Sequence, residues 1–218
     1  MRLRWLDLLR SMAILGMITY HTAYDLQFYH GLHTVDVTTG RWKLFQIGVA
    51  SLFLIVVGIS AGLWTRAEAV KKGWKRGWRI LSAAMLVSLA TAIIDDRTWV
   101  RFGILHCIAL SAFIVPFVRR IHPAIIVLLG AACIALEPFV PSPSFATVDW
   151  VPPIPWLGPV FLGFAVGIPL SKLPSKPTRP SRTFDLLAWP GKHSLGIYLL
   201  HQPIIVGSLA LLEHARVL

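Results

Sequence analysis

Seven long apolar stretches constrain the fold of this 218-residue chain more than any other feature. Each is long enough, at roughly 17–25 residues, to cross the hydrocarbon core of a bilayer as an α-helix. Their approximate bounds are 5–24, 44–64, 78–94, 102–118, 123–140, 155–170 and 189–212. A soluble domain of this length has too little interior for a chain that is 56% hydrophobic and only 14% charged. The sequence therefore predicts an all-α, polytopic membrane protein with a single domain over residues 1–218.

The basic residues between these stretches predict the orientation. One alternating set of loops holds most of them: Arg2, Arg4, Arg66, Lys71, Lys72, Lys75, Arg76, Arg79, Arg119, Arg120, Lys172, Lys176, Arg179, Arg182 and Lys192. The other set holds only Arg41, Lys43, Arg97, Arg101 and Arg216. Because Lys and Arg concentrate in cytoplasmic loops, we expect a cytoplasmic N-terminus, an outer C-terminus and a multi-pass protein of the cytoplasmic (inner) membrane.

Several other classes are disfavoured. The net charge of +11 is distributed between apolar segments, which fits topology and lipid headgroups rather than nucleic acid. Both cysteines, Cys107 and Cys133, lie within apolar segments, so a disulfide framework is not expected. Asp7 and Arg10 interrupt the first apolar run and no small-residue cleavage site follows, which favours a retained helix over a signal peptide. The P-loop, dinucleotide, HExxH and GxSxG patterns do not occur in the sequence.

Ionisable residues inside the apolar stretches are the candidates for function, because they are costly in a membrane. Arg10 and His21 are 11 residues apart, which is about three helical turns and about 16.5 Å along one face. Asp25 follows His21 by one turn on the same face. A carboxylate within reach of an imidazole orients it as an acid–base group. The alternative is a polar stripe whose members only bond neighbouring helices.

Two further histidines lie inside predicted helices. His106 falls a few residues into the fourth stretch, at roughly the depth of His21, and His201 lies near the middle of the seventh. Pro203 is expected to kink that helix and to free a carbonyl group, so His201 has a structural alternative as a partner of irregular backbone.

Two groups of residues outside the helices have weaker claims. His30, His33 and Asp36 are predicted in the first outer loop, where solvated side chains are commoner than a metal site, and no metal is expected. The basic run that includes Arg76 and Arg79 has the charge to bind the phosphates of an anionic ligand, but positive-inside topology explains it equally well.

Four segments resemble the transmembrane acyltransferase superfamily, and in particular the small bacterial members of its heparan-α-glucosaminide N-acetyltransferase-like branch. They are 6–13 (LDLLRSMA, followed by His21 and Asp25), 102–110 (FGILHCIAL), 156–163 (WLGPVFLG) and 191–203 (GKHSLGIYLLHQP). They occur in the family's order and span nearly the whole chain. Ser11 stands where a glycine commonly follows the arginine.

The resemblance implies transfer of an acetyl group from cytoplasmic acetyl-CoA to a sugar hydroxyl or amine on the outer side. An arginine and histidine pair in one branch maps onto Arg10 and His21. The functional histidine of the heparan branch lies nearest to His30, which is the second choice. His21 is then expected to act as general base or transient acyl carrier oriented by Asp25, with His106 or His201 as a donor for the oxyanion.

Two other functions remain open. A small proton-coupled transporter would use the His and Asp residues as a relay and would not depend on acyl-CoA. A non-catalytic scaffold or lipid-binding subunit would tolerate loss of His21 and Asp25. The small residues Gly158, Gly163 and Gly167 also permit a homodimer.

Overall fold

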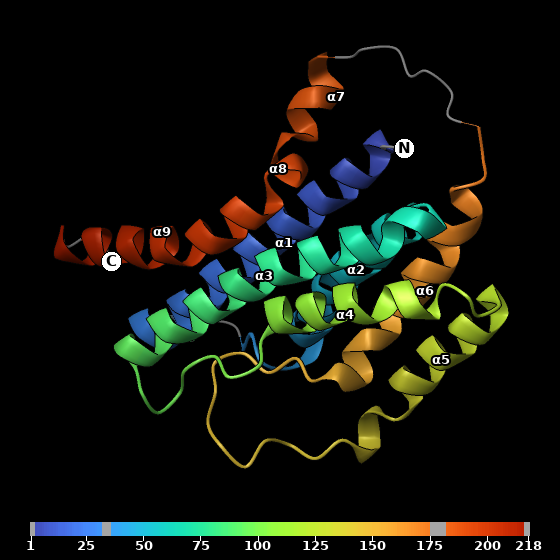
Figure 1. Cartoon of the computed structure of the whole chain (residues 1–218). Coiled ribbons are helices and arrows are strands. Elements are labelled where there is room, and N and C mark those ends of the chain that lie inside the picture. The colour runs from blue at the N-terminus through green and yellow to red at the C-terminus, as the bar shows by residue number, and fades with distance from the viewer. Residues whose placement is uncertain (1–2, 32–35, 175–181, 216–218) are drawn as a thin grey trace. The chain divides into compact units, whose positions relative to one another are not determined.

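The computed structural model describes residues 3–31, 36–174 and 182–215, and these residues form helices and connecting loops and no β-strand (Figure 1). The helices are α1 (Arg4–His30), α2 (Gly40–Gly62), α3 (Arg66–Ile94), α4 (Ile104–Val118), α5 (Pro123–Ala135), the 3-10 helix η1 (Glu137–Phe139), α6 (Pro153–Leu170), α7 (Arg182–Leu187), α8 (Trp189–Lys192) and α9 (Ser194–His214). The chain divides into two compact units, and α2 contributes residues to both.

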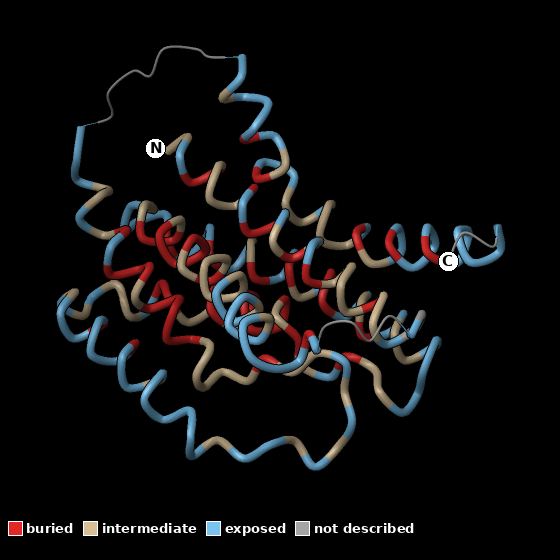
Figure 2. The backbone as a smooth tube through the Cα atoms, turned by 180° about the vertical axis from the view of Figure 1, so that it is seen from behind, coloured by how far each residue is buried: buried red, intermediate tan, exposed pale blue. Residues whose placement is uncertain are grey.

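The first unit covers Leu54–Pro177 and contains the end of α2 together with α3, α4, α5, η1 and α6. Within it α3 packs on α4, and α6 packs on α4 and α5. Glycines allow the backbones to approach: a Cβ on Gly58 would lie 2.1 Å from the carbonyl oxygen of Val160, and one on Gly163 would lie 2.1 Å from that of Ile55. Among the helices of this unit, α4 and α6 contain the most buried residues, and buried segments are red in Figure 2.

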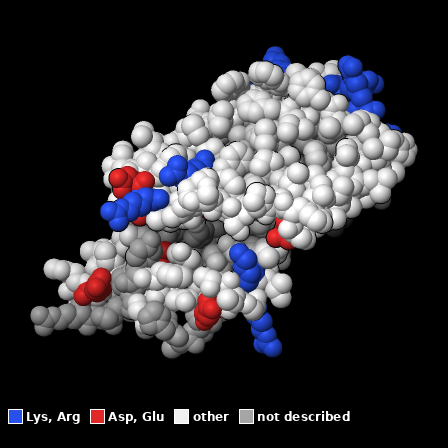
Figure 3. Space-filling model, turned by 90° about the horizontal axis from the view of Figure 1, so that it is seen from below, with Lys and Arg blue, Asp and Glu red and all other residues white. Residues whose placement is uncertain are grey.

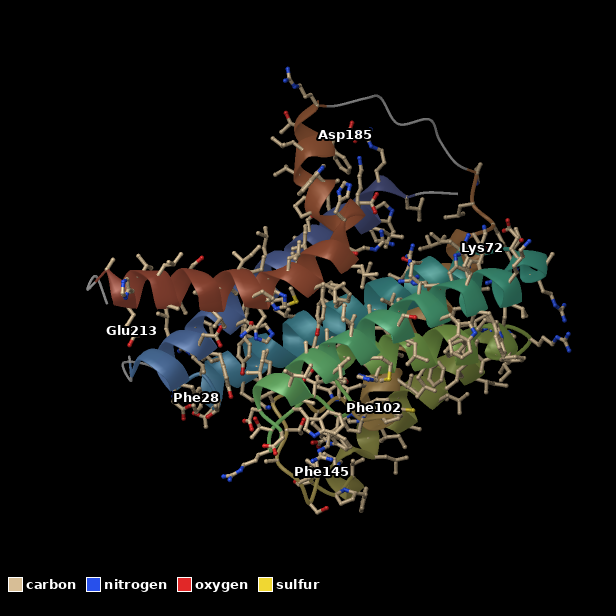
Figure 4. All side chains as sticks on the ribbon, turned by 60° about the vertical axis from the view of Figure 1, so that its left-hand side comes forward. Phe28, Lys72, Phe102, Phe145, Asp185 and Glu213 are labelled. Atoms are coloured by element: carbon tan, nitrogen blue, oxygen red, sulfur yellow. The ribbon has the colours of Figure 1, made fainter. Side chains whose placement is uncertain are left out.

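The second unit covers Arg2–Phe53 and Thr178–Leu218 and joins the two ends of the chain. In it α8 and α9 pack along α1 (Figure 1). Asp185 on α7, labelled in Figure 4, forms ion pairs of 3.1 Å with Arg4 and with Lys192. These pairs attach α7 to the first turn of α1 and to the end of α8. The labelled residues Phe28 and Glu213 mark the last turns of α1 and α9 in the same view.

Local chemistry explains where the helices differ from their predicted bounds. The α3 helix begins at Arg66 rather than 78, because Thr65 and Glu68 form a capping box with a 2.8 Å hydrogen bond between their side chains. The helix predicted over 123–140 ends at Ala135, and Pro138, which has no backbone N–H, lies in η1. The basic run up to Arg79 is therefore helical and not a loop.

The first and last predicted spans differ in another way. The α1 helix continues to His30 and ends on Gly31, whose φ of 68° is a left-handed conformation that suits glycine. The stretch predicted over 189–212 is interrupted at His193 (φ −108°, ψ 23°), which separates α8 from α9. Helix α9 is continuous through Pro203.

Apolar side chains cover much of the surface, as expected for a protein surrounded by lipid. Among the described residues, α2, α3, α6 and α9 are long and apolar enough to cross a membrane, and α4 and α5 are shorter apolar helices. The most exposed apolar residues of α3 and α9 include Leu86, Leu89, Ile93, Ile94, Leu200, Ile204 and Leu211. Only a few charged side chains lie on the face shown in Figure 3, and most of that face is formed by other residues.

Candidate functional site

Two histidines from opposite ends of the sequence meet in the second unit. Helix α1 carries His21 and α9 carries His201, and their ring centroids are 5.0 Å apart in an edge-to-face arrangement. The His21 ring is half-buried and also meets the ring of Tyr20 at 5.8 Å. His201 is buried, with 8% of its surface exposed. The packing of α9 on α1 thus brings together two imidazoles that lie 180 positions apart in the chain.

The hydrogen bond of His201 to its own helix defines which of its nitrogens is a base. Its Nδ1 lies 2.5 Å from the carbonyl oxygen of Tyr198. A carbonyl only accepts, so Nδ1 carries the proton and Nε2 of the neutral ring carries the lone pair. Among the described residues no hydrogen-bonding partner reaches this buried Nε2 atom. Neutral His201 is consequently arranged as a proton acceptor, which differs from the oxyanion donor expected from sequence.

The Asp25 carboxylate is held by the residue after His201. Asp25 is buried, with 1% exposed, and both of its oxygens accept from Nε2 of Gln202, at 3.0 Å for Oδ1 and 2.8 Å for Oδ2. Since His21 and Asp25 are one turn apart on α1, the consecutive residues His201 and Gln202 contact the same face of that helix. The structure thereby unites His21, Asp25 and His201 of the predicted site and adds Gln202.

Arg10 lies in a second polar cluster of this unit. Its guanidinium pairs with Asp7 at 2.5 Å, and Asp7 is only 1% exposed. The Ser11 hydroxyl donates to the Asp7 carbonyl oxygen at 3.0 Å and accepts from the N–H of Gly191 at 2.9 Å. A Cβ on Gly191 would lie 1.9 Å from that carbonyl oxygen. Ser11 thus joins α1 to α8 where the two backbones approach closely.

His106 belongs to the first unit, where both of its ring nitrogens have protein partners. Nδ1 accepts from the N–H of Gly103 at 3.2 Å, so Nε2 of the neutral ring carries the proton and faces the Ser88 hydroxyl at 3.4 Å. Ser88 in turn donates to the carbonyl oxygen of Val100 at 2.7 Å. This is not a nucleophilic Ser–His arrangement, because the imidazole nitrogen facing Ser88 holds a proton. The contacts attach the first turn of α4 to α3.

The loop before α6 completes this part of the first unit. Phe102 and Phe145, both labelled in Figure 4, flank Trp150 at centroid distances of 6.4 and 5.3 Å. Asp149 accepts from the N–H of Ile104 at 3.1 Å and so caps α4. Burial raises the pKa of the Asp149 carboxyl to about 6, and the hydrogen bond from Ile104 opposes that rise.

We expect Asp149→Asn to flatten the pH dependence of stability. A carboxyl whose pKa is raised from 3.8 to about 6 by folding stabilises the fold below pH 3.8, and this contribution is lost as the pH rises toward 6. Two pKa units set an upper limit of about 3 kcal/mol, and the half-buried side chain reduces it. Thermal unfolding in detergent at pH 4.5, 5.5 and 7.5 measures the effect. Parallel pH profiles for wild type and variant would contradict it.

The remaining predicted site residues lie elsewhere in the sequence, at the end of α1 and on α3. His30 is the last residue of α1 rather than a loop residue, and His33 lies outside the described residues. On α3, Arg76 is half-buried and Arg79 is exposed. Within the described part of the chain there is no group of three His, Cys, Asp or Glu side chains suited to a metal ion.

Sequence reasoning missed the partners Gln202, Asp7 and Ser11. The sequence contains one signal for Gln202: it is the only amide side chain in an otherwise apolar stretch of α9, and it follows a histidine. Ser11 departs from the family pattern, and its contact with Gly191 gives that departure a structural role. The glycines considered for a homodimer are used within the chain: Gly158 approaches Gly130, and Gly163 approaches Ile55.

Together these observations define an all-helical integral membrane protein with a buried polar site between α1 and α9. The family model for the catalytic domain of heparan-alpha-glucosaminide N-acetyltransferase matches residues 2–203. The chain belongs to this heparan-alpha-glucosaminide N-acetyltransferase-like acyltransferase family, as its sequence motifs predicted. Membership identifies it as a transferase of the membrane. No curated protein and no solved structure matches the chain.

Proposed function

We propose that the chain transfers an acetyl group from cytoplasmic acetyl-CoA to an amine or hydroxyl of a sugar on the outer side of the inner membrane. The observation that carries the proposal is the pairing of His21 with His201 at 5.0 Å, beside the buried carboxylate of Asp25. A chain of the acetyltransferase family with two imidazoles in contact has the groups that acyl transfer requires.

The proposed topology has seven crossings with the N-terminus in the cytoplasm. Four helices meet the length and hydropathy expected of spans, and α4 and α5 are apolar. Helix α1 has 27 residues, enough to cross, but its polar stripe lowers its hydropathy. Asp7 and Asp25 are buried and each has a polar partner, which supports a membrane position for α1, because charged groups in a span must be paired. Both units are proposed to form one catalytic domain, since the family match includes them.

Acid–base chemistry at the histidines provides the proposed mechanism. The acceptor nitrogen or oxygen forms a bond to the thioester carbonyl carbon as its proton passes to an imidazole. The carbon–sulfur bond then breaks, and the proton leaves with the sulfur as the free thiol of CoA. His21 is the first candidate for the base or for a transient acyl carrier, and Nε2 of His201 is a second base that can accept the proton. His30 remains the alternative to His21.

The donor is proposed to bind through basic residues, without a metal. Arg10 is the candidate beside the pantetheine arm, and its pairing with Asp7 fixes the guanidinium in place. Arg76 and Arg79, on the basic first half of α3, are candidates for the phosphates. His106 is proposed only as a weaker candidate oxyanion donor, because its Nε2 proton is already directed at Ser88.

Calorimetric titration of acetyl-CoA into purified protein tests this function. Wild type is expected to show saturable binding, and Arg10→Ala to weaken it by roughly tenfold or more, the value of a lost charge-assisted hydrogen bond. His21→Ala should retain binding, because it removes the reacting base and not the donor site.

Two controls accompany the titration. Arg10→Lys retains a cation beside Asp7, so it distinguishes weaker acetyl-CoA binding from a loss of protein stability. Arg41→Ala changes an exposed residue and should bind acetyl-CoA as wild type does. Absence of binding to wild type at millimolar acetyl-CoA would contradict the proposal. Proton flux through vesicles containing the same protein would then favour the transporter, in which His21, His201 and Asp25 form a relay.

A further inference from the structure

Two buried acceptor atoms lie on consecutive residues of α9. These are Nε2 of His201 and Oε1 of Gln202, and neither has a hydrogen-bonding partner among the described residues. Only 8% of the surface of His201 is exposed, and the Gln202 oxygen is also buried. A buried polar atom without a partner is unfavourable, so a ligand that satisfies both atoms gains affinity.

Asp25 determines which end of the Gln202 amide is directed away from α1. A carboxylate only accepts hydrogen bonds, and the same Gln202 nitrogen lies 3.0 and 2.8 Å from its two oxygens. The NH₂ group must therefore face Asp25, and the carbonyl oxygen must face elsewhere. Reversal of this amide would place two acceptors against one another.

The two acceptors follow the same face of α1. His201 meets His21, and Gln202 meets Asp25, one turn further along that helix. This region contains lone pairs and a carboxylate, which repel an anion and attract N–H or O–H groups. A phosphate or carboxylate ligand is therefore a poor match for it.

We propose that Gln202 is a specificity-determining residue, which presents Oε1 together with Nε2 of His201 to a ligand group that carries N–H or O–H donors. The inference rests on the proposed function, since it assigns a substrate contact to the same site. Two sources have this chemistry: the amine or hydroxyl of the acceptor, and the amide N–H groups of the pantetheine arm. Asp25 acts through Gln202 as a positioning residue.

An exchange of the Asp25 and Gln202 functional groups tests the inference. Asp25→Asn replaces one acceptor oxygen by an NH₂ group, so the Gln202 amide is no longer held with its oxygen toward the ligand and can instead direct its NH₂ group there. The double variant Asp25→Asn/Gln202→Glu retains the hydrogen bond between α1 and α9 and restores an acceptor. The probes are glucosamine and pantetheine, titrated separately by calorimetry, with the KM for each substrate measured where transfer occurs.

We expect Asp25→Asn to raise the dissociation constant of one probe about tenfold or more, and the double variant to recover it to within about threefold. Loss confined to glucosamine identifies the acceptor as the bound group, and loss confined to pantetheine identifies the donor arm. If the double variant binds as weakly as Asp25→Asn while its unfolding midpoint matches wild type, the inference is wrong. If Asp25→Asn does not fold, Gln202→Met provides the same test, and unchanged binding in that variant overturns the inference.

Two comparisons separate this result from the proposed function. Gln46→Met, which removes a half-buried amide of α2 that accepts a hydrogen bond from Lys43 at 3.1 Å, should leave both affinities unchanged. If wild type binds a probe with the expected exchange pattern but transfers no acetyl group, the site stands and the acetyltransferase function fails. If wild type transfers acetyl groups and the exchange has no effect, the function stands and the role of Gln202 fails.

Discussion

We expect His21→Ala to lower the rate constant of acetyl transfer by about 10²–10⁴-fold, the usual contribution of a positioned acid–base group. His201→Ala is expected to act in the same direction, because its Nε2 is the other base of the pair. Since the two rings are in contact, the double variant should be little slower than the slower single variant. Single-turnover transfer from radiolabelled acetyl-CoA to glucosamine measures all three.

Binding and a distant histidine supply the controls for this prediction. His21→Ala should bind acetyl-CoA as wild type does, which assigns its loss of rate to chemistry. His214→Ala changes an exposed residue at the end of α9 and should leave the rate unchanged. If His21→Ala retains more than a tenth of the wild-type rate constant, His21 is excluded as the base. His30 and His201 are then the candidates.

The second large effect concerns the glycine contacts of the first unit. Gly163→Ala would place a Cβ 2.1 Å from the carbonyl oxygen of Ile55, and Gly58→Ala would place one 2.1 Å from that of Val160. Both obstacles are backbone atoms, so the two helices must separate. We expect a destabilisation of about 3 kcal/mol or more for each variant, at or above the upper end of the overpacking range. Denaturant unfolding in detergent micelles measures it.

Gly48→Ala is the matched control for this effect, because it also lies on α2 and a Cβ there would meet nothing within 4 Å. Alanine has the higher helix propensity, so this variant should be neutral or more stable by up to about 1 kcal/mol. Equal stability of Gly163→Ala and Gly48→Ala would show that α2 and α6 do not make the described contact.

Sequence reasoning was most successful where the signal is local. Apolar length predicted the helices because each residue buried in lipid contributes separately, and the one-turn spacing of His21 and Asp25 placed them on one face of α1. The bounds were less accurate at Ala135 and His193. At these two positions the helix ends are set by proline chemistry and by a change of backbone conformation, and apolar periodicity predicts neither.

The pairing of helices was outside the reach of these local patterns. Asp25 and Gln202 are 177 residues apart, and nothing in the spacing of either residue indicates the other. Their contact depends on α9 packing along α1. The same packing brings His201 to His21, whereas His106, which looked equivalent from its depth in the sequence, is held by Gly103 and Ser88 in the first unit.

By itself the sequence determined the helical membrane class, the polar face of α1 and, through its motifs, the family, because these depend on composition and short-range spacing. Only the tertiary structure decided which polar groups are partners and which lone pairs are left for a ligand. The physical reason is that hydrogen bonding of a buried group depends on the direction of each donor and acceptor, and those directions are set when helices distant in the chain pack together.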